Sequence, residues 1–337
     1  MHHSHSSSDS ASELSRSDRL EARDLDVQAV DEIEKLTGRH PGYRRAHAKG
    51  ACYQATFQPS GEAAAWTTAP HLQGQPVEAL VRFSESSTDP ALADLLSPAK
   101  GMAVQFRLPE GQVSNLVAVT VPVFFARTPE SFMDMLKAVN KARAGNLGIK
   151  EIIHQITGHF GEAKESLLSV QRLRPPASYV TNLYYCIHAY LLVNEAGQRQ
   201  PVKFEWLPEA GVHMLSIKDT TSQPPDYLER ELDERLQQQP ATFRLNIIIG
   251  EEGDPTDDPT TAWPENRQRI DAGRLVLTAP VQEPEGLVMD PTILPPQGIE
   301  LSDDPILNFR RSAYAESWRR RSHEAAEGND KEQGRDS

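Results

Sequence analysis

Short segments rich in apolar residues recur along the chain and predict β-strands. In residues 101–109, "GMAVQFRLP", every second position from Met102 to Leu108 is apolar, as in a strand with one buried face. The segment 115–126, "NLVAVTVPVFFA", is almost entirely apolar, so we expect a strand buried on both faces. Further strands are expected at 52–58, 79–86, 182–193, 201–208, 243–250 and 274–281.

Apolar residues three or four positions apart predict helices between these strands. They recur at this spacing from Val27 to Leu36, and Gly38 is expected to end that helix. A second helix opens with Thr128 as its N-cap and Pro129 in its first turn. Other helices are expected at 149–173, 225–239 and 306–324, and irregular connections at 251–266 and 282–305.

The succession of strands and inserted helices predicts an α+β chain whose antiparallel sheet closes into a barrel. A barrel of this kind can hold a ligand against its wall. We expect the folded domain to span residues 23–323, between polar tails at 1–22 and 324–337 that lack the apolar residues needed to order. The first tail also lacks the apolar segment of a signal peptide.

Charge and cysteine content narrow the classes of function. The 337 residues carry a formal net charge of −13, with an isoelectric point near 5.3, which argues against general binding to nucleic acid or to an anionic membrane. Cys52 and Cys186 lie far apart and form no metal-binding or disulfide pattern, which favours reduced thiols in a cytoplasmic protein.

The last predicted helix carries an unusual stripe of side chains. Its members are spaced by four, three and four residues and share one helix face: Arg310, Tyr314, Ser317 and Arg321. Guanidinium groups lower the cost of ionising a phenol, and a ferric ion stabilises the phenolate further. A tyrosinate is a rare heme ligand. On spacing alone, the simpler explanation of the stripe is a basic amphipathic helix with one aromatic residue against the core, and we would prefer it.

A histidine near the N-terminus raises a similar choice. His47 lies in "YRRAHAKGACY", residues 43–53, just before a predicted strand. It is either part of a basic surface turn or a proton-handling group beside a buried site.

Seven segments, taken in order, favour a functional role for both Tyr314 and His47. "RRAHAKG", "VRFSES", "KGMAVQFRLPEG", "NLVAVTVPVFFARTPESF", "VKFEWLPEAG", "DPTDDPTTAWP" and "GIELSDDPILNFRRSAY" resemble the heme-dependent catalases. Among these, the chain is most similar to the short catalase-related peroxidases. The resemblance covers roughly residues 25–322 and implies a catalase-like antiparallel β-barrel with inserted and C-terminal helices, without the C-terminal extensions of large catalases.

The resemblance also implies roles for individual residues in a site for heme b. His47 matches the catalytic distal histidine, and Tyr314 matches the axial ligand of the heme iron. The remaining matches are cofactor-binding positions: Arg44 and Arg82 for the propionates, Ser84 beside the histidine, Phe124 and Phe132 around the heme, Arg310 beside the tyrosine and Arg321 on the heme side.

One position departs from the family pattern. Catalases carry two asparagines before "PxFF", and the first helps to hold the peroxide. The corresponding residues here are Val119 and Thr120. Losing one hydrogen bond to peroxide costs about 1–3 kcal/mol, which is expected to slow oxygen release more than the first reduction of peroxide.

The resemblance therefore implies a heme peroxidase. It is expected to reduce hydrogen peroxide or small organic hydroperoxides through a ferryl intermediate, with an organic electron donor and weak catalase activity. A true catalase, a hydroperoxide-rearranging enzyme and a barrel that only binds or carries heme are the alternatives. We expect neither nucleic acid nor a membrane as a partner. Because the extensions of large catalases are missing, we expect a monomer or homodimer.

Overall fold

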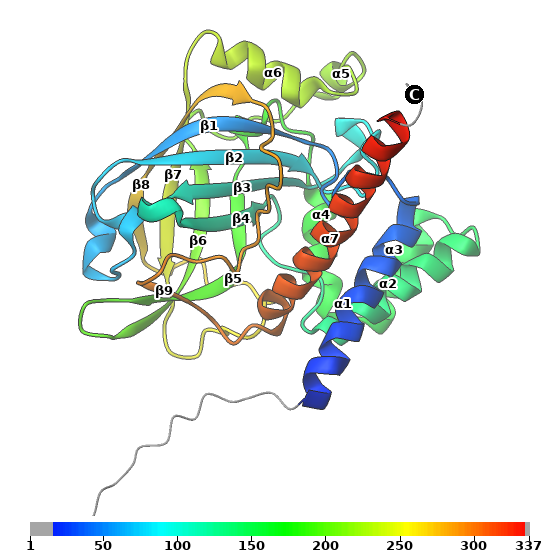
Figure 1. Ribbon diagram of the computed structural model, residues 1–337, viewed down its shortest axis with the longest axis horizontal. Coiled ribbons are helices and arrows are strands. Elements are labelled where there is room, and N and C mark those ends of the chain that lie inside the picture. Colours follow the sequence, from blue (N-terminus) through cyan, green and yellow to red (C-terminus); the bar gives the residue numbers. More distant parts are fainter. Residues whose placement is uncertain (1–15, 334–337) are drawn as a thin grey trace, which may run out of the picture.

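The chain folds around a closed antiparallel β-barrel (Figure 1). The computed structural model describes residues 16–333. Eight strands follow one another around the barrel in the order β4-β3-β2-β1-β8-β7-β6-β5, and the pairing of Val119 with Tyr185 joins β4 to β5. The strands are β1 (Gly50–Pro59), β2 (Val77–Glu85), β3 (Lys100–Arg107), β4 (Val113–Val119), β5 (Tyr184–Val193), β6 (Arg199–Pro208), β7 (Ala241–Ile249) and β8 (Arg269–Val281). A short strand, β9 (Ile299–Leu301), pairs with β5.

Large side chains fill the interior of the barrel. Alternate residues of every barrel strand point inward, and the fully buried ones include Tyr53, Phe57, Phe83, Phe106, Tyr184, Trp206 and Phe243. The apolar face of α6 (Tyr227–Leu236) joins the same cluster through Leu228, Leu232 and Leu236. Because the interior is a packed core, a large ligand has to bind on the outer side of the wall.

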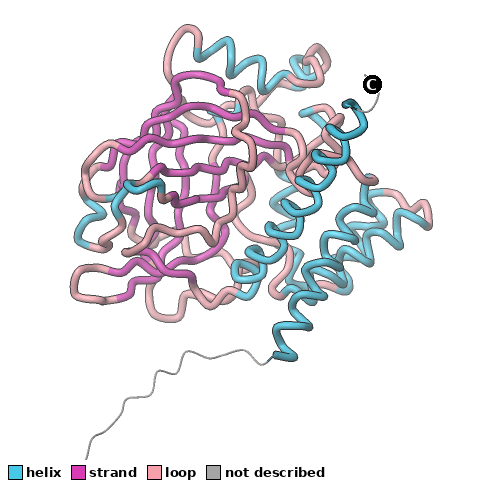
Figure 2. The backbone as a smooth tube through the Cα atoms, in the orientation of Figure 1, coloured by secondary structure: helices cyan, strands magenta, loops and turns pink. Residues whose placement is uncertain are grey.

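Most helices gather on one side of the barrel (Figures 1 and 2). They are α1 (Arg16–Thr37), α2 (Pro129–Ala144), α3 (Ile149–His159), α4 (Lys164–Arg172) and α7 (Pro305–Gln333). Within this group, α7 lies between the barrel and the pair α1 and α2 in Figure 1. The one-turn helix α5 (Ile217–Thr220) precedes α6. Short 3₁₀ turns lie at Glu62–Ala65, Pro70–Leu72, Asp94–Leu96, Pro109–Gly111, Gly161–Ala163 and Tyr179–Thr181.

The predicted N-terminus of α2 is confirmed. The Thr128 side chain accepts a hydrogen bond from the Ser131 backbone N–H at 3.2 Å, and the Ser131 hydroxyl accepts one from the Thr128 N–H, also at 3.2 Å. This reciprocal arrangement satisfies two backbone donors, and Pro129 occupies the first turn as expected.

The prediction of one strand over residues 115–126 is wrong. β4 ends at Val119, and residues 120–128 leave the barrel as a loop that leads to α2. Pro122 has no N–H to continue a ladder, and the Phe124 N–H donates to Pro259 O at 2.8 Å, outside the sheet. The apolar run is therefore partly a buried loop.

Other boundaries also differ from the prediction. The helix expected at 149–173 is divided into α3 and α4 around Gly161–Ala163, and the connection expected at 282–305 contains β9 and the first residue of α7. Both terminal helices extend into the segments predicted as polar tails, while residues 1–15 and 334–337 lie outside the described residues. Among the described helices, none is both long and apolar enough to cross a membrane.

Candidate active site

The outer face of β2, β3 and β4 provides the floor of the candidate site. Ser84 pairs with Gly101, which pairs in turn with Val119. Paired residues of antiparallel strands point to the same face, so these three positions form a row across the wall. Arg82 lies two residues before Ser84 and shares this face, whereas Phe83 between them belongs to the interior cluster.

His47 lies over this row, immediately before β1. Its backbone has a φ of +53°, a left-handed conformation that is uncommon outside glycine. Its Nδ1 lies 2.9 Å from the Ser84 hydroxyl oxygen. A Cβ atom on Gly101 would lie 2.8 Å from that Nδ1, so only glycine leaves room for the imidazole. Backbone conformation, hydrogen bond and close approach together fix the ring over the strand face.

The electrostatic surroundings keep His47 uncharged. Burial lowers the pKa of His47 to about 4, and the positive charges of Arg82, Arg310 and Arg44 add to the effect. At neutral pH the imidazole is therefore neutral and can accept a proton.

Three predicted arginines converge on one carboxylate, that of Glu283. Arg44 donates to both of its oxygens at 2.6 and 2.8 Å, and Arg82 Nε donates to one of them at 2.9 Å. A nitrogen of Arg321 lies 3.9 Å from the other oxygen. Arg44 and Arg321 also donate to the same carbonyl oxygen, that of Leu287, each at 3.0 Å. Guanidinium groups from β2, from the segment before β1 and from α7 thus meet at one place, which we call the arginine cluster.

The arginine cluster carries more positive than negative charge. Burial lowers the pKa of Arg82, as does the neighbouring charge of Arg44, while Glu283 opposes both effects. Three guanidinium groups around one carboxylate leave an excess of two positive charges at a largely buried position, so the cluster is suited to binding further anionic groups.

The predicted stripe on α7 faces this site. Arg310 donates to His188, the Ser317 hydroxyl accepts from the backbone N–H of Arg45, and Arg321 reaches Leu287. Tyr314 lies between these residues on the same helix face and is half-buried. The stripe that includes Tyr314 is therefore directed towards the segment that carries His47.

A buried chain of polar groups orients Arg310. Its Nε donates to His188 Nε2 at 2.7 Å, and His188 Nδ1 lies 2.6 Å from a carboxylate oxygen of Asp304. The other oxygen of Asp304 accepts from the backbone N–H groups of Ile306 and Leu307, at 2.8 and 3.1 Å. One carboxylate thus caps α7 and fixes the imidazole that holds Arg310.

The same chain sets the charge state of His188. Burial lowers the pKa of His188 to about 4, and the charge of Arg310 lowers it further, while the hydrogen bond that His188 donates to Asp304 acts in the opposite direction. A neutral His188 can donate from Nδ1 to Asp304 and accept from Arg310 at Nε2.

Aromatic residues after β4 border the same region. Phe124 lies with its ring 5.2 Å from the guanidinium carbon of Arg310, a cation–π arrangement. The ring centroids of Phe124 and Phe132 are 6.0 Å apart, and Phe125 lies 4.2 Å from Phe124. These half-buried rings pack with the apolar side chains of α2 and α3.

Two contributors were missed by sequence reasoning. His188 lies inside the strand expected at 182–193, where a histidine is most simply explained as a core residue; it is buried, but it also links Asp304 to Arg310. Glu283 lay in a connection predicted to be irregular. Neither has a local signal in the sequence, because the residues that form hydrogen bonds with each are more than one hundred positions away.

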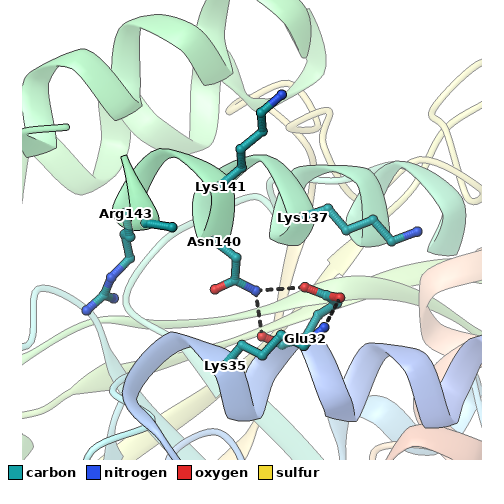
Figure 3. Close-up of a pocket in the computed structure, with 7 residues that line it drawn as sticks. Glu32, Lys35, Lys137, Asn140, Lys141 and Arg143 are labelled. Atoms are coloured by element: carbon teal, nitrogen blue, oxygen red, sulfur yellow. Dashed lines mark hydrogen bonds and ion pairs between the residues drawn. The ribbon is translucent and has the colours of Figure 1, made fainter. Parts of the chain in front are cut away.

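A separate surface pocket lies between α1 and α2 (Figure 3). It has a volume of about 650 Å³ and is lined mainly by charged side chains, among them Glu32, Lys35, Lys137, Lys141 and Arg143. Glu32 accepts hydrogen bonds from Lys35 and Asn140 across it. None of the predicted site residues lines this pocket, so it is distinct from the candidate active site.

Known proteins are similar to this chain in both sequence and fold. The family model for catalase matches residues 6–327. The chain belongs to the catalase family. It is 32% identical to the catalase-related peroxidase of Synechococcus elongatus, over 87% of this chain and 88% of the relative. It is 36% identical to the catalase-related peroxidase of Mycolicibacterium paratuberculosis, over 86% of this chain and 92% of the relative.

Solved catalase structures show the same fold. Catalase A from Saccharomyces cerevisiae superimposes with a TM-score of 0.74 at 23% identity, over 87% of this chain and 64% of that one. A fungal catalase gives a TM-score of 0.73 at 22% identity, over 84% of this chain and 59% of the other. The chain thus spans about three-fifths of these larger catalases, and the predicted catalase-like barrel is confirmed.

The family implies a heme cofactor, and the residues present fit one. The arginine cluster has the two unbalanced positive charges that two propionates would neutralise. The phenol of Tyr314 is a suitable oxygen donor for ferric iron. His47 and Phe124 supply an imidazole and an aromatic face in the same region.

The two positions where catalases carry asparagine are also defined by the structure. Val119 pairs with Gly101, the glycine beneath His47, so an amide at position 119 would be on the histidine's side of the wall. Thr120 is engaged with the backbone, because its hydroxyl accepts from the Lys100 N–H at 3.0 Å. Of these two positions, Val119 is the one that shares the row beneath His47, and its side chain cannot form a hydrogen bond.

Proposed function

We propose that this protein is a peroxidase that binds heme b and reduces hydrogen peroxide or small organic hydroperoxides at the expense of an organic electron donor. The observation that carries the proposal is the meeting of three parts of the chain. The ring of His47 is fixed over β2 and β3, the arginine cluster lies beside it, and the Tyr314 stripe of α7 is directed towards both. The names of the two relatives in Synechococcus and Mycolicibacterium support the same activity.

Bound heme supplies the iron at which the peroxide O–O bond is reduced. The protein's task is to bind this group, position the peroxide and move a proton. Neutral His47 takes the proton from one peroxide oxygen and returns it to the other, so that water can leave. Ser84 holds Nδ1, which leaves Nε2 as the nitrogen that handles the proton.

The arginines position the cofactor. Arg44, Arg82 and Arg321 would hold the propionates, and Tyr314 would bind the iron as a phenolate. Arg310, one helical turn before Tyr314, provides positive charge beside the phenolate oxygen and is kept in place by His188 and Asp304.

The side chain at position 119 affects the ratio of catalase to peroxidase activity. Val119 offers no hydrogen bond to peroxide beside His47, so the step that oxidises a second peroxide to oxygen is slowed relative to reduction by a donor. We therefore propose weak catalase activity. The two cysteines are buried free thiols, which supports the further proposal of a reducing, cytoplasmic setting.

Steady-state assays of the heme-loaded protein test this proposal. Donor oxidation and oxygen evolution are measured with the same peroxide, with and without a phenolic donor. We expect donor oxidation to exceed oxygen release, and added donor to suppress oxygen release further. Rapid oxygen release that is insensitive to donor would instead indicate a true catalase, and an unreactive heme protein would indicate heme binding alone.

A further inference from the structure

Glu283 takes part in the arginine cluster in an unusual way. Its carboxylate accepts hydrogen bonds from Arg44 on both oxygens and from Arg82 on one, and Arg321 lies 3.9 Å away. These are the same donors that the proposed heme propionates require. Burial opposes ionisation of this carboxyl group, but Arg44 and Arg82 hold its pKa below the usual value, so it is charged at neutral pH.

Glu283 lies at the partly exposed side of the arginine cluster. It lies two residues beyond the end of β8, in the connection that runs between the barrel and α7 in Figure 1, and 33% of its side chain is exposed. Arg82, in contrast, is anchored: its Nη1 and Nη2 donate to the carbonyl oxygens of His47 and Ala48 at 3.2 and 3.3 Å. Arg82 is thus a fixed donor, and it faces the most exposed side chain of the cluster.

We propose that Glu283 is an internal competitor for the heme propionates and thereby sets how firmly the protein holds heme. The proposal rests on the heme site described above. With heme in place, three guanidinium groups would bind three carboxylates, namely Glu283 and the two propionates. Glu283 would then repel the propionates and compete with them for hydrogen-bond donors. Without that negative charge, all of these donors are available to the propionates. Removing the charge at 283 should therefore strengthen heme binding.

The test compares heme release from Glu283→Gln and wild-type holoprotein. Excess apomyoglobin captures released heme, and the absorbance change gives the rate. Glutamine keeps the size of the side chain and removes its charge. Glu285→Gln is the matched control, because Glu285 is an exposed neighbour in the same connection and loses the same charge. We expect Glu283→Gln to release heme at least about tenfold more slowly, the effect of one charge-assisted hydrogen bond, and Glu285→Gln to release it at the wild-type rate.

Heme dimethyl ester shows whether the propionates are responsible. It carries no carboxylate charge, so the wild type and Glu283→Gln should release it at equal rates. Faster release of heme by Glu283→Gln would overturn the proposal and identify Glu283 as a group that organises the arginines. An unchanged rate, or an equal slowing with the ester, would also overturn it. Wild-type protein that retains neither compound would contradict the heme site itself, which separates that failure from a failure of the role of Glu283.

Discussion

At the scale of single residues, His47 shows how several weak constraints fix one functional group. The left-handed backbone, the Ser84 hydroxyl and the missing side chain of Gly101 each limit where the imidazole lies. A non-glycine residue in this backbone conformation costs free energy, and such conformations cluster at functional sites. His47 could be identified from the sequence segment around it. Its contacts with Ser84 on β2 and Gly101 on β3 could not be predicted, because they depend on how the strands pair.

Replacing His47 tests its role as the proton-handling group. His47→Ala should lower the rate of peroxide reduction about 10²–10⁴-fold, since that is the usual contribution of a positioned acid–base group. Stopped-flow absorbance of the heme-loaded variant measures the rate. His213→Ala, an exposed histidine beyond β6, serves as the control and should react like the wild type. A His47→Ala rate within a factor of about three of wild type would contradict the assignment.

The low pKa of His47 predicts an unusual pH profile. Because burial lowers this pKa to about 4, the neutral imidazole persists well below pH 6.5. The rate of peroxide reduction should therefore stay level from pH 7 to about 5 and fall as the pH decreases through about 4. Circular dichroism at each pH separates this titration from acid unfolding. A fall centred near pH 6.5 in folded protein would show that the histidine titrates as an exposed one.

Position 119 can be tested by restoring an amide. Val119→Asn should increase oxygen release from peroxide about 5–150-fold, the range for one hydrogen bond of about 1–3 kcal/mol. A Clark electrode measures the release. Val117→Asn places the same side chain two residues earlier on the same strand face, opposite Ala103 rather than Gly101, and should have little effect. Equal responses of the two variants would exclude the proposed role of position 119.

At the scale of elements, α7 connects the two sides of the site. Its Glu324 is buried and accepts from Arg39 and Arg45 at 2.6 Å each and from the Gly42 N–H at 3.1 Å. These contacts fasten the segment before His47 to the helix that carries Tyr314. The relative position of the two residues thus depends on the ion pairs of Glu324 with Arg39 and Arg45 as well as on packing.

Glu324→Gln should weaken that connection. The buried Arg45 would then keep Glu34 as a carboxylate partner but lose its contacts with Glu324. We therefore expect a loss of about 3 kcal/mol in the free energy of unfolding, the lower end of the range for a broken buried ion pair, measured by denaturant titration. Glu300→Gln is the matched control: its pair with Arg199 is exposed on both sides, and its loss should stay below about 1 kcal/mol. Similar losses for the two variants would show that the Glu324 contact is as weak as a surface ion pair.

Sequence patterns located most elements but not all of their ends. The N-terminus of α2 was predictable because its determinants, Thr128 and Pro129, are local. The end of β4 was not, since apolar residues continue to Phe125 both in the strand and in the buried loop after it. Apolar character reports burial, whereas strand pairing depends on partners elsewhere in the chain.

At the scale of the whole molecule, the packed interior of the barrel determines where the candidate site can lie. Tyr53, Phe83 and Trp206 fill the interior, so the chemistry lies between the outer wall and α7. The family resemblance implied which residues belong to the site. Sequence reasoning did not find two features that form only when distant segments meet. These are the hydrogen-bonded chain of Asp304, His188 and Arg310, and the place of Glu283 among the arginines.

Tyr314 is the residue that we propose would bind the iron of heme. Resonance Raman spectra of heme-loaded wild type and Tyr314→Phe test this proposal most directly. The wild type should show phenolate vibrations enhanced by coordination to iron, and these should vanish in Tyr314→Phe together with most of the heme affinity. Tyr43→Phe, which alters an exposed tyrosine near His47, should leave them intact. Unchanged phenolate bands and heme content in Tyr314→Phe would contradict the account.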